Sequence, residues 1–182
     1  MRTDFLLRQT KTGATAFTKV FALVNKSILR DRILFQLKQE LARQTSAAAS
    51  SRDEAISEES RAENKWDTHS QEAAYLAEGQ AKLAAEISVN LEIYASLPLP
   101  DFSAGDLITI GALVELGNAG ESAWYFMGPR AGGLELTLED RNILVLTPQS
   151  PLGRLLLGKR QGDIVQTAGR SGATVQRILS VH

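Results

Sequence analysis

The sequence feature that most constrains the fold is a stretch without glycine or proline that runs through residues 25–78. Apolar residues recur at every fourth position near its start, which places them on one face of a helix. That stripe consists of Leu29, Ile33, Leu37 and Leu41. Frequent alanines favour helix, and the Ser27 hydroxyl is placed to cap a helix that begins at Ile28. The stretch therefore predicts a long helix.

A second helical pattern runs up to Pro98 and Pro100, which end helices because proline lacks the backbone N–H. We expect this helix to begin near Lys65 or Trp66. Its apolar and amide residues alternate at spacings of three and four, which is typical of coiled-coil packing. The expected seam consists of Leu76, Gln80, Leu83, Ile87, Asn90 and Tyr94.

The two helices are expected to form an antiparallel coiled-coil hairpin over residues 25–97, because single helices of this composition are marginal in water. Arms of roughly 30 residues span about 45 Å each. Gly79 lowers helix stability and is expected to allow close approach of the other arm. The expected contacts pair Leu29, Ile33, Leu37 and Leu41 with Tyr94, Leu91, Ile87 and Leu83, in that order.

A polar, mostly charged segment at residues 58–68 separates the two helical patterns. We expect it to form the exposed tip of the hairpin and to hold acidic side chains far from the body of the protein. Its acids are Glu58, Glu59, Glu63 and Asp67. Ordinary solvated charges are the alternative reading of these acids, and Trp66 either packs against the turn or contacts a partner.

Composition excludes several kinds of site. The chain of 182 residues has no cysteine, so disulfides, thiolate zinc sites and cysteine nucleophiles are excluded. Only two histidines, His69 and His182, are present, which argues against a protein-only zinc site or a Ser-His-Asp triad. A net charge of -1 does not predict strong non-specific binding to nucleic acid. The composition suits a reducing cytoplasm, and no stretch approaches the ~18 apolar residues of a membrane span.

Residues 1–24 differ from the rest of the chain in their charge. Four basic residues face one acid: Arg2, Arg8, Lys11 and Lys19 against Asp4. The longest apolar run, residues 20–24, is too short for a signal-peptide core. We expect a disordered or weakly helical tail, and a basic arm that contacts a partner is the alternative.

Beyond a linker at residues 97–102 the pattern changes to period two and to turn residues, which predicts strands. Ser150 and Pro151 suit the cap and first position of a short helix that Gly158 ends. Residues 101–182 are therefore expected to form an α+β domain, a small twisted antiparallel sheet with one short helix. Strands are expected at 107–116, 124–127, 134–138, 143–147, 164–165 and 173–181.

The run at residues 150–165, Ser-Pro-Leu-Gly-Arg-Leu-Leu-Leu-Gly-Lys-Arg-Gln-Gly-Asp-Ile-Val, resembles the C-terminal domain of the GreA/GreB transcription elongation factors. In that family Ser-Pro, a hydrophobic residue, Gly or Ala, and a basic residue open the helix. Gly-Lys and then Gly-Asp lead to the next strand. A long hairpin followed by this domain also matches the family order, so the resemblance extends from about residue 25 to the end. It implies an FKBP-like fold for the C-terminal domain.

The resemblance also implies a function. Family members dock on bacterial RNA polymerase at the rim of its secondary channel and insert the coiled-coil tip. There the tip acids help to hold a second Mg²⁺ at the polymerase active site and position the water that cleaves backtracked RNA. The chain would be an accessory factor and no enzyme, with no cofactor of its own, no membrane and no small-molecule substrate. It would meet nascent RNA and DNA within the elongation complex, and DNA binding is associated with the family.

Site residues carry over from the family one by one. Family tips commonly read Asp-Leu-(Lys or Ser)-Glu-Asn, with the Asp and the Glu as the functional pair. Residues 60–64, Ser-Arg-Ala-Glu-Asn, align with this through Glu-Asn. Glu63 is therefore the expected functional acid and ligand of the shared Mg²⁺, whereas Ser60 stands where the family has aspartate. Candidate second acids are Glu59, Glu58 and Asp67, and polymerase contacts are expected at Ser150, Pro151, Arg154, Lys159 and Arg160.

Three alternatives to cleavage stimulation stay open. The first is a channel-binding regulator that does not stimulate cleavage, which Ser60 favours. The second is a peptidyl-prolyl isomerase, although the domain offers few aromatic residues for a substrate pocket: Phe102, Trp124, Tyr125 and Phe126. The third is a purely structural, dimeric coiled coil.

Overall fold

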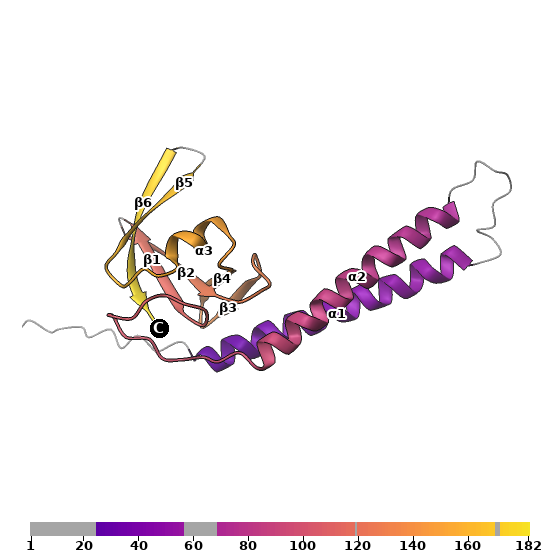
Figure 1. The fold of residues 1–182 in the computed structure, drawn as a ribbon, viewed down its shortest axis with the longest axis horizontal. Coiled ribbons are helices and arrows are strands. Elements are labelled where there is room, and N and C mark those ends of the chain that lie inside the picture. The colour runs from indigo at the N-terminus through magenta and orange to yellow at the C-terminus, as the bar shows by residue number, and fades with distance from the viewer. Residues whose placement is uncertain (1–24, 57–68, 119, 170–171) are drawn as a thin grey trace, which may run out of the picture.

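The computed structural model describes residues 25–56, 69–118, 120–169 and 172–182. Two long helices come first and a six-stranded sheet with one short helix follows, so the fold is α+β (Figure 1). In chain order the elements are α1 Lys26–Ile56, α2 His69–Ala95, β1 Leu113–Asn118, β2 Glu121–Met127, β3 Glu135–Leu138, β4 Arg141–Leu146, α3 Pro151–Leu156, β5 Ile164–Gly169 and β6 Gly172–Val181.

The first helix begins two residues earlier than expected. The Asn25 side-chain oxygen accepts hydrogen bonds from the Ser27 backbone N–H at 3.0 Å and from the Ser27 hydroxyl at 2.6 Å. The Asn25 carbonyl accepts the first helical bond, from the Leu29 N–H. Asn25 is therefore the N-cap, and Ser27 lies inside the first turn.

Helices α1 and α2 lie side by side as the expected antiparallel hairpin (Figure 1). Close to the base of the hairpin, the α1 stripe is buried from Leu29 to Leu37. It shares one hydrophobic cluster with Tyr94, Leu91 and Ile87 of α2, which are the α2 residues expected to pack against it. Leu41, one residue of the fourth pairing, is only partly buried. The expected start of α2 near Lys65 or Trp66 lies outside the described residues.

The upper part of the α2 seam differs from the expected one. Leu76 and Leu83 are 55% and 48% exposed, whereas Ala73 is buried, and Ala77 and Ala84 are partly buried. The sequence pattern favoured the larger side chains, but alanines one position further along the helix face α1. At the centre of this alanine-rich region the Ser51 hydroxyl donates a 3.1 Å hydrogen bond to the Gln80 side-chain oxygen. Gly79 lies off the interface, with open space around it, so it does not serve close approach of the arms.

The sheet has the strand order β3-β4-β2-β1-β6-β5. Four of its pairings are antiparallel, but β2 and β4 run parallel, so the sheet is mixed and the expectation of a wholly antiparallel sheet was wrong. After β2 the chain passes to the sheet edge, forms β3, and returns as β4 between β3 and β2, which makes β4 run in the direction of β2. The expected strands at 134–138 and 143–147 correspond to β3 and β4, which form an antiparallel hairpin. Its two-residue turn, Glu139 and Asp140, has positive φ at both positions, as type I′ turns require.

The first strand is shorter at its start than the expected 107–116. Gly111 adopts a φ of 92°, a conformation that interrupts an extended strand. β1 therefore begins at Leu113. The preceding Ile108 is fully buried and exchanges backbone hydrogen bonds with the segment after α3, from its N–H to the Lys159 carbonyl and from the Gly158 N–H to its own carbonyl.

Alternating residues of the strands face two separate cores. On one face, Trp124 and Phe126 of β2 join the base of the hairpin in one cluster. On the other, Tyr125 and Met127 join the cluster that contains Leu156 of α3. The hairpin base and α3 therefore cover opposite faces of the sheet, and burial of the first cluster couples the hairpin to the domain.

Two side chains join the hairpin to the domain. Tyr94 is fully buried and its hydroxyl donates a 2.7 Å hydrogen bond to the Arg130 carbonyl. The Lys26 ammonium donates to the Pro100 carbonyl and lies 4.8 Å from the Phe102 ring centroid. Burial lowers the pKa of Lys26, and the nearby Asp101 carboxylate partly opposes that shift. These contacts hold both helices of the base against the sheet and its linker.

Candidate functional site

The expected tip acids lie outside the described residues. Glu58, Glu59, Glu63 and Asp67, together with Ser60, belong to the segment between Ile56 and His69. The ends of α1 and α2 that flank this segment lie at the end of the hairpin far from the sheet (Figure 1). At 1.5 Å per residue, α1 spans about 46 Å. The roles of the tip acids therefore stay predictions, attached to an arm whose direction and base are defined.

The short helix α3 is built by the first residues of the family-like motif. Ser150 is its N-cap: the hydroxyl accepts the Gly153 N–H at 3.1 Å and donates to the Thr147 carbonyl at 2.8 Å. Pro151 occupies the first helical position, where its missing N–H costs nothing. The Ser150 hydroxyl is thus committed to the fold, while the exposed Pro151 ring stays accessible to a partner.

The glycines of the motif also have structural causes. Gly153 is buried, and a Cβ there would overlap with the Thr147 carbonyl and the Ser150 hydroxyl. Gly158 and Gly162 have φ values of 76° and 92°, in the left-handed region that glycine tolerates best. Much of the motif is therefore a requirement of this loop–helix–turn, and the candidates for binding are its solvent-facing side chains.

The basic side chains of the motif are exposed around α3. The Arg154 guanidinium donates to the Gln149 carbonyl from Nε at 2.9 Å and from Nη2 at 2.7 Å, which holds it across the start of the helix. Lys159 and Arg160 follow in the turn, where the Asp163 carboxylate accepts the Arg160 backbone N–H at 2.9 Å. That bond shapes the turn and leaves the Arg160 side chain exposed. The expected cluster Arg154, Lys159 and Arg160 is thus present as a solvent-facing basic surface.

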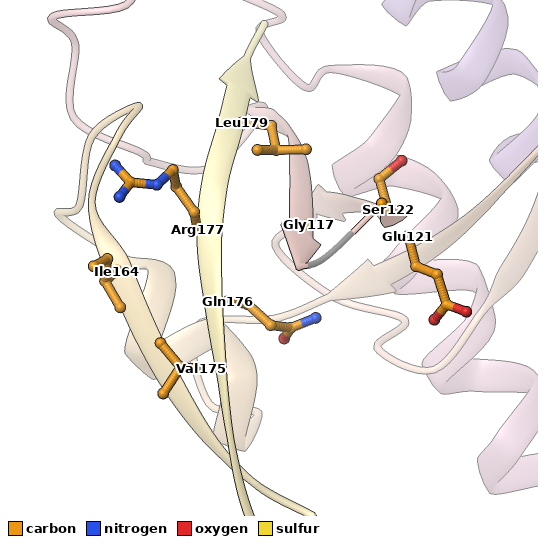
Figure 2. A pocket seen from close by; sticks show the side chains of 9 residues that line it. Gly117, Glu121, Ser122, Ile164, Val175, Gln176, Arg177 and Leu179 are labelled. Carbon is orange, nitrogen blue, oxygen red and sulfur yellow. The ribbon is translucent and has the colours of Figure 1, made fainter.

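A groove of about 450 Å³ on the sheet was not expected from the sequence. It lies where β5 and β6 meet the β1–β2 turn, and Figure 2 shows the side chains around it. Apolar side chains contribute much of its lining: Ile164, Val175 and Leu179. The alternation of Val175, Arg177 and Leu179 along the last strand is the sequence signal that could have indicated an exposed apolar face.

The described residues also bear on metal binding and on the isomerase alternative. Among them, no group of three or more His, Asp or Glu side chains is placed to hold a metal ion. Trp124 and Phe126 are buried beneath the hairpin base, so they cannot line an isomerase pocket. Tyr125 borders a separate hollow with Leu152 and Leu155. Neither long helix, over its described residues, is apolar enough to cross a membrane.

Sequence comparisons found no matching protein-family model and no matching curated protein. Structural comparison found Gfh1 from Thermus aquaticus, with 24% identity and a TM-score of 0.36 over 84% of this chain and 92% of that chain. It also found GreA factor homolog 1 from Thermus thermophilus, with 21% identity and a TM-score of 0.34 over 84% of this chain and 94% of that chain.

A third similar structure is the prokaryotic transcription elongation factor GreA/GreB from Nitrosomonas europaea. It has 20% identity and a TM-score of 0.34 over 57% of this chain and 78% of that chain. The chain is thus similar to Gfh1 and GreA/GreB transcription factors at low identity. Values this low transfer no residue role to this chain.

Proposed function

We propose that this protein is an accessory factor that binds bacterial RNA polymerase and inserts the tip of its hairpin into the secondary channel. The proposal rests on the motif at residues 150–165 and on the order of a long hairpin followed by a small α+β domain. It implies a cytoplasmic protein whose partner is the polymerase. It does not include direct DNA binding, which the net charge of -1 gives no reason to expect.

One observation carries the proposal: the hairpin base and the sheet share a hydrophobic core, while the other end of the hairpin projects away from the sheet (Figure 1). An arm that is fixed at its base can present a tip at a defined distance and direction from a docked domain. A hairpin tethered only by a flexible linker would lose that definition. A purely dimeric coiled coil would have no need of this fixed joint.

In the proposed complex the tip contributes carboxylate and the polymerase contributes its own metal site. Mg²⁺ prefers carboxylate oxygens and keeps several waters, so a single added acid can help to hold a second ion near the first. Glu63 is the proposed acid, and Glu58, Glu59 or Asp67 would supply any second carboxylate. We propose cleavage stimulation of backtracked RNA as the activity.

The alternative is a regulator that occupies the channel without stimulating cleavage. Ser60 favours it, because serine at the position of the family aspartate removes one of two expected charges. The two proposals share the same docking and the same arm. They differ only in what the tip does at the active site.

Transcript cleavage in stalled elongation complexes separates the two proposals. Stimulation by the wild type, lost in Glu63→Ala with polymerase binding unchanged, supports the delivered carboxylate. Ser60→Asp should then raise cleavage, most clearly at low Mg²⁺. Glu92→Ala, which removes an exposed acid near the hairpin base, is the matched control and should leave cleavage unchanged. If neither the wild type nor Ser60→Asp stimulates cleavage, the result supports the regulator that occupies the channel without stimulating cleavage.

Docking of the domain has its own test. Reversing the charges of Arg154, Lys159 and Arg160 together should slow association with polymerase and weaken its salt dependence. Unchanged binding in that triple variant would place the contact elsewhere on the domain. An isomerase assay on the full chain tests the peptidyl-prolyl isomerase alternative, and isomerase activity without polymerase binding would replace the proposal.

A further inference from the structure

The hairpin covers only part of the sheet face on which it packs. Trp124 on that face is buried beneath the hairpin base. Further across the sheet, Val175 and Leu179 of β6 are 51% and 40% exposed, and Ile164 of β5 is 54% exposed. Three large apolar side chains thus remain exposed next to a buried core. They belong to the groove shown in Figure 2.

The strand register shows that the groove and the hairpin core share one face. Trp124 pairs with Glu115 of β1, and Gly117, two residues further on, pairs with Arg177 of β6. Arg177 in turn pairs with Ile164 of β5. Residues opposite each other in adjacent strands lie on the same face. The groove therefore continues the surface that the hairpin base covers.

Gly117 deepens the groove, and side chains of opposite charge, Arg177 and Glu121, line its two sides (Figure 2). Gly117 has no side chain, and a Cβ there would overlap with the Leu179 side chain. Arg177 extends toward β5, where its guanidinium donates to the Gly162 carbonyl at 3.0 Å, and Glu121 stands on the opposite wall (Figure 2). An occupant of this groove would meet apolar side chains along the floor and the Glu121 carboxylate on one wall.

The chain enters α1 close to one end of this groove. Leu29, in the first turn of α1, belongs to the same buried cluster as Trp124, and the Lys26 charge lowers the pKa of His182, an effect secondary to burial. His182 directly follows β6 and stacks on Trp124 with ring centroids 6.0 Å apart. The start of α1 therefore lies near His182, which is three residues from Leu179.

The sequence of that segment matches the groove. Residues 17–24 read Phe-Thr-Lys-Val-Phe-Ala-Leu-Val, which is apolar apart from Thr18 and Lys19. Eight extended residues reach about 26–29 Å, whereas β6 from His182 back to Val175 extends about 23 Å at 3.3 Å per residue. We propose that residues 17–24 of this chain lie along the groove, with their apolar side chains on Leu179, Val175 and Ile164. The proposal is independent of polymerase binding.

Thiol labelling tests this proposal, because the chain has no cysteine of its own. One probe is Leu179→Cys in the groove, and its matched control is Leu155→Cys on α3, on the opposite side of the sheet. The two native leucines are equally exposed, at 40%. Each is labelled with a maleimide in the full chain, in the chain without residues 1–24, and in a full chain carrying Phe21→Asp and Leu23→Asp. The last variant keeps the test valid if the shortened chain does not fold.

The proposal predicts that Leu179→Cys reacts roughly tenfold more slowly in the full chain than in the other two backgrounds, the ratio that about 1.4 kcal/mol of docking free energy gives. Leu155→Cys should react at the same rate in all three. Equal rates for Leu179→Cys in all backgrounds would overturn the proposal. Protection that grows with protein concentration would also overturn it, because the occupant would then be a second copy of the chain.

Discussion

The joint between hairpin and domain depends on a close fit between Tyr94 and Gly128. The Tyr94 hydroxyl reaches the Arg130 carbonyl by passing over Gly128, which has no side chain. A Cβ at position 128 would overlap with the Tyr94 Oη and would lie 2.9 Å from Val145 Cγ1. Gly128→Ala should therefore displace the Tyr94 ring from its place in the core.

The size of the effect follows from the two contacts. Tyr94→Phe loses one hydrogen bond, which costs about 1 kcal/mol. Gly128→Ala overpacks a closed core, which costs about 1–3 kcal/mol. In the double variant the Oη overlap no longer exists, although the Val145 contact stays. The double variant should therefore be more stable than the sum of the single effects predicts, by about 1 kcal/mol.

Urea unfolding of the wild type, both single variants and the double variant measures this coupling. Far-ultraviolet circular dichroism reports the helices, and the loss of hairpin and domain structure should coincide because they share a core. Additive costs, within about 0.5 kcal/mol, would refute the proposed contact between Tyr94 and position 128. Separate transitions would refute the fixed joint itself.

Three further predictions concern stability. Gly79→Ala should raise the free energy of unfolding by about 0.5–1 kcal/mol, because Gly79 lies inside α2 with open space around it; urea unfolding that shows no gain would contradict this. Gly153→Ala should destabilise the domain, since its Cβ would overlap with the Thr147 carbonyl, whereas Gly105→Ala, with nothing near its Cβ, should change the urea midpoint little. Burial raises the pKa of Tyr94 above the ordinary 10.0, so the folded state keeps a proton that the unfolded chain loses above pH 10. Stability should therefore be lost as pH rises above 10, by about 1.4 kcal/mol per pH unit from this group; a Tyr94→Phe chain with the same slope as wild type would show that Tyr94 does not cause it.

The parts of the fold that could be predicted from sequence are those with a strong local pattern. The α1 stripe from Leu29 to Leu37 is regular, and Ser150 with Pro151 marks a helix start by a local hydrogen bond and a fixed φ. The seam of α2 is only partly predictable, because hydrophobicity favours Leu76 and Leu83. Close packing of two helices depends on the shape of the pair, and there the alanines fit better.

Features that depend on distant pairing were not predictable. The parallel β2–β4 pairing results from the path of residues 128–134 to the sheet edge, which no local pattern encodes. The burial of Tyr94 against Gly128 and the contact of Lys26 with Phe102 join residues far apart in the sequence. For the candidate site, the motif residues were identified from sequence. The structure adds that Ser150 and Gly153 serve the fold, while Arg154, Lys159 and Arg160 face solvent.

Photo-crosslinking to purified bacterial RNA polymerase tests the central claim most directly. A photoreactive amino acid replaces Glu63 at the tip, and a second protein carries it at Glu92 near the hairpin base as the control. The account predicts that position 63 crosslinks to polymerase residues inside the secondary channel beside the catalytic Mg²⁺, and that position 92 does not reach them. Binding to polymerase with crosslinks from position 63 only to its outer surface, or with none, would contradict the claim that the hairpin delivers its tip to the active site.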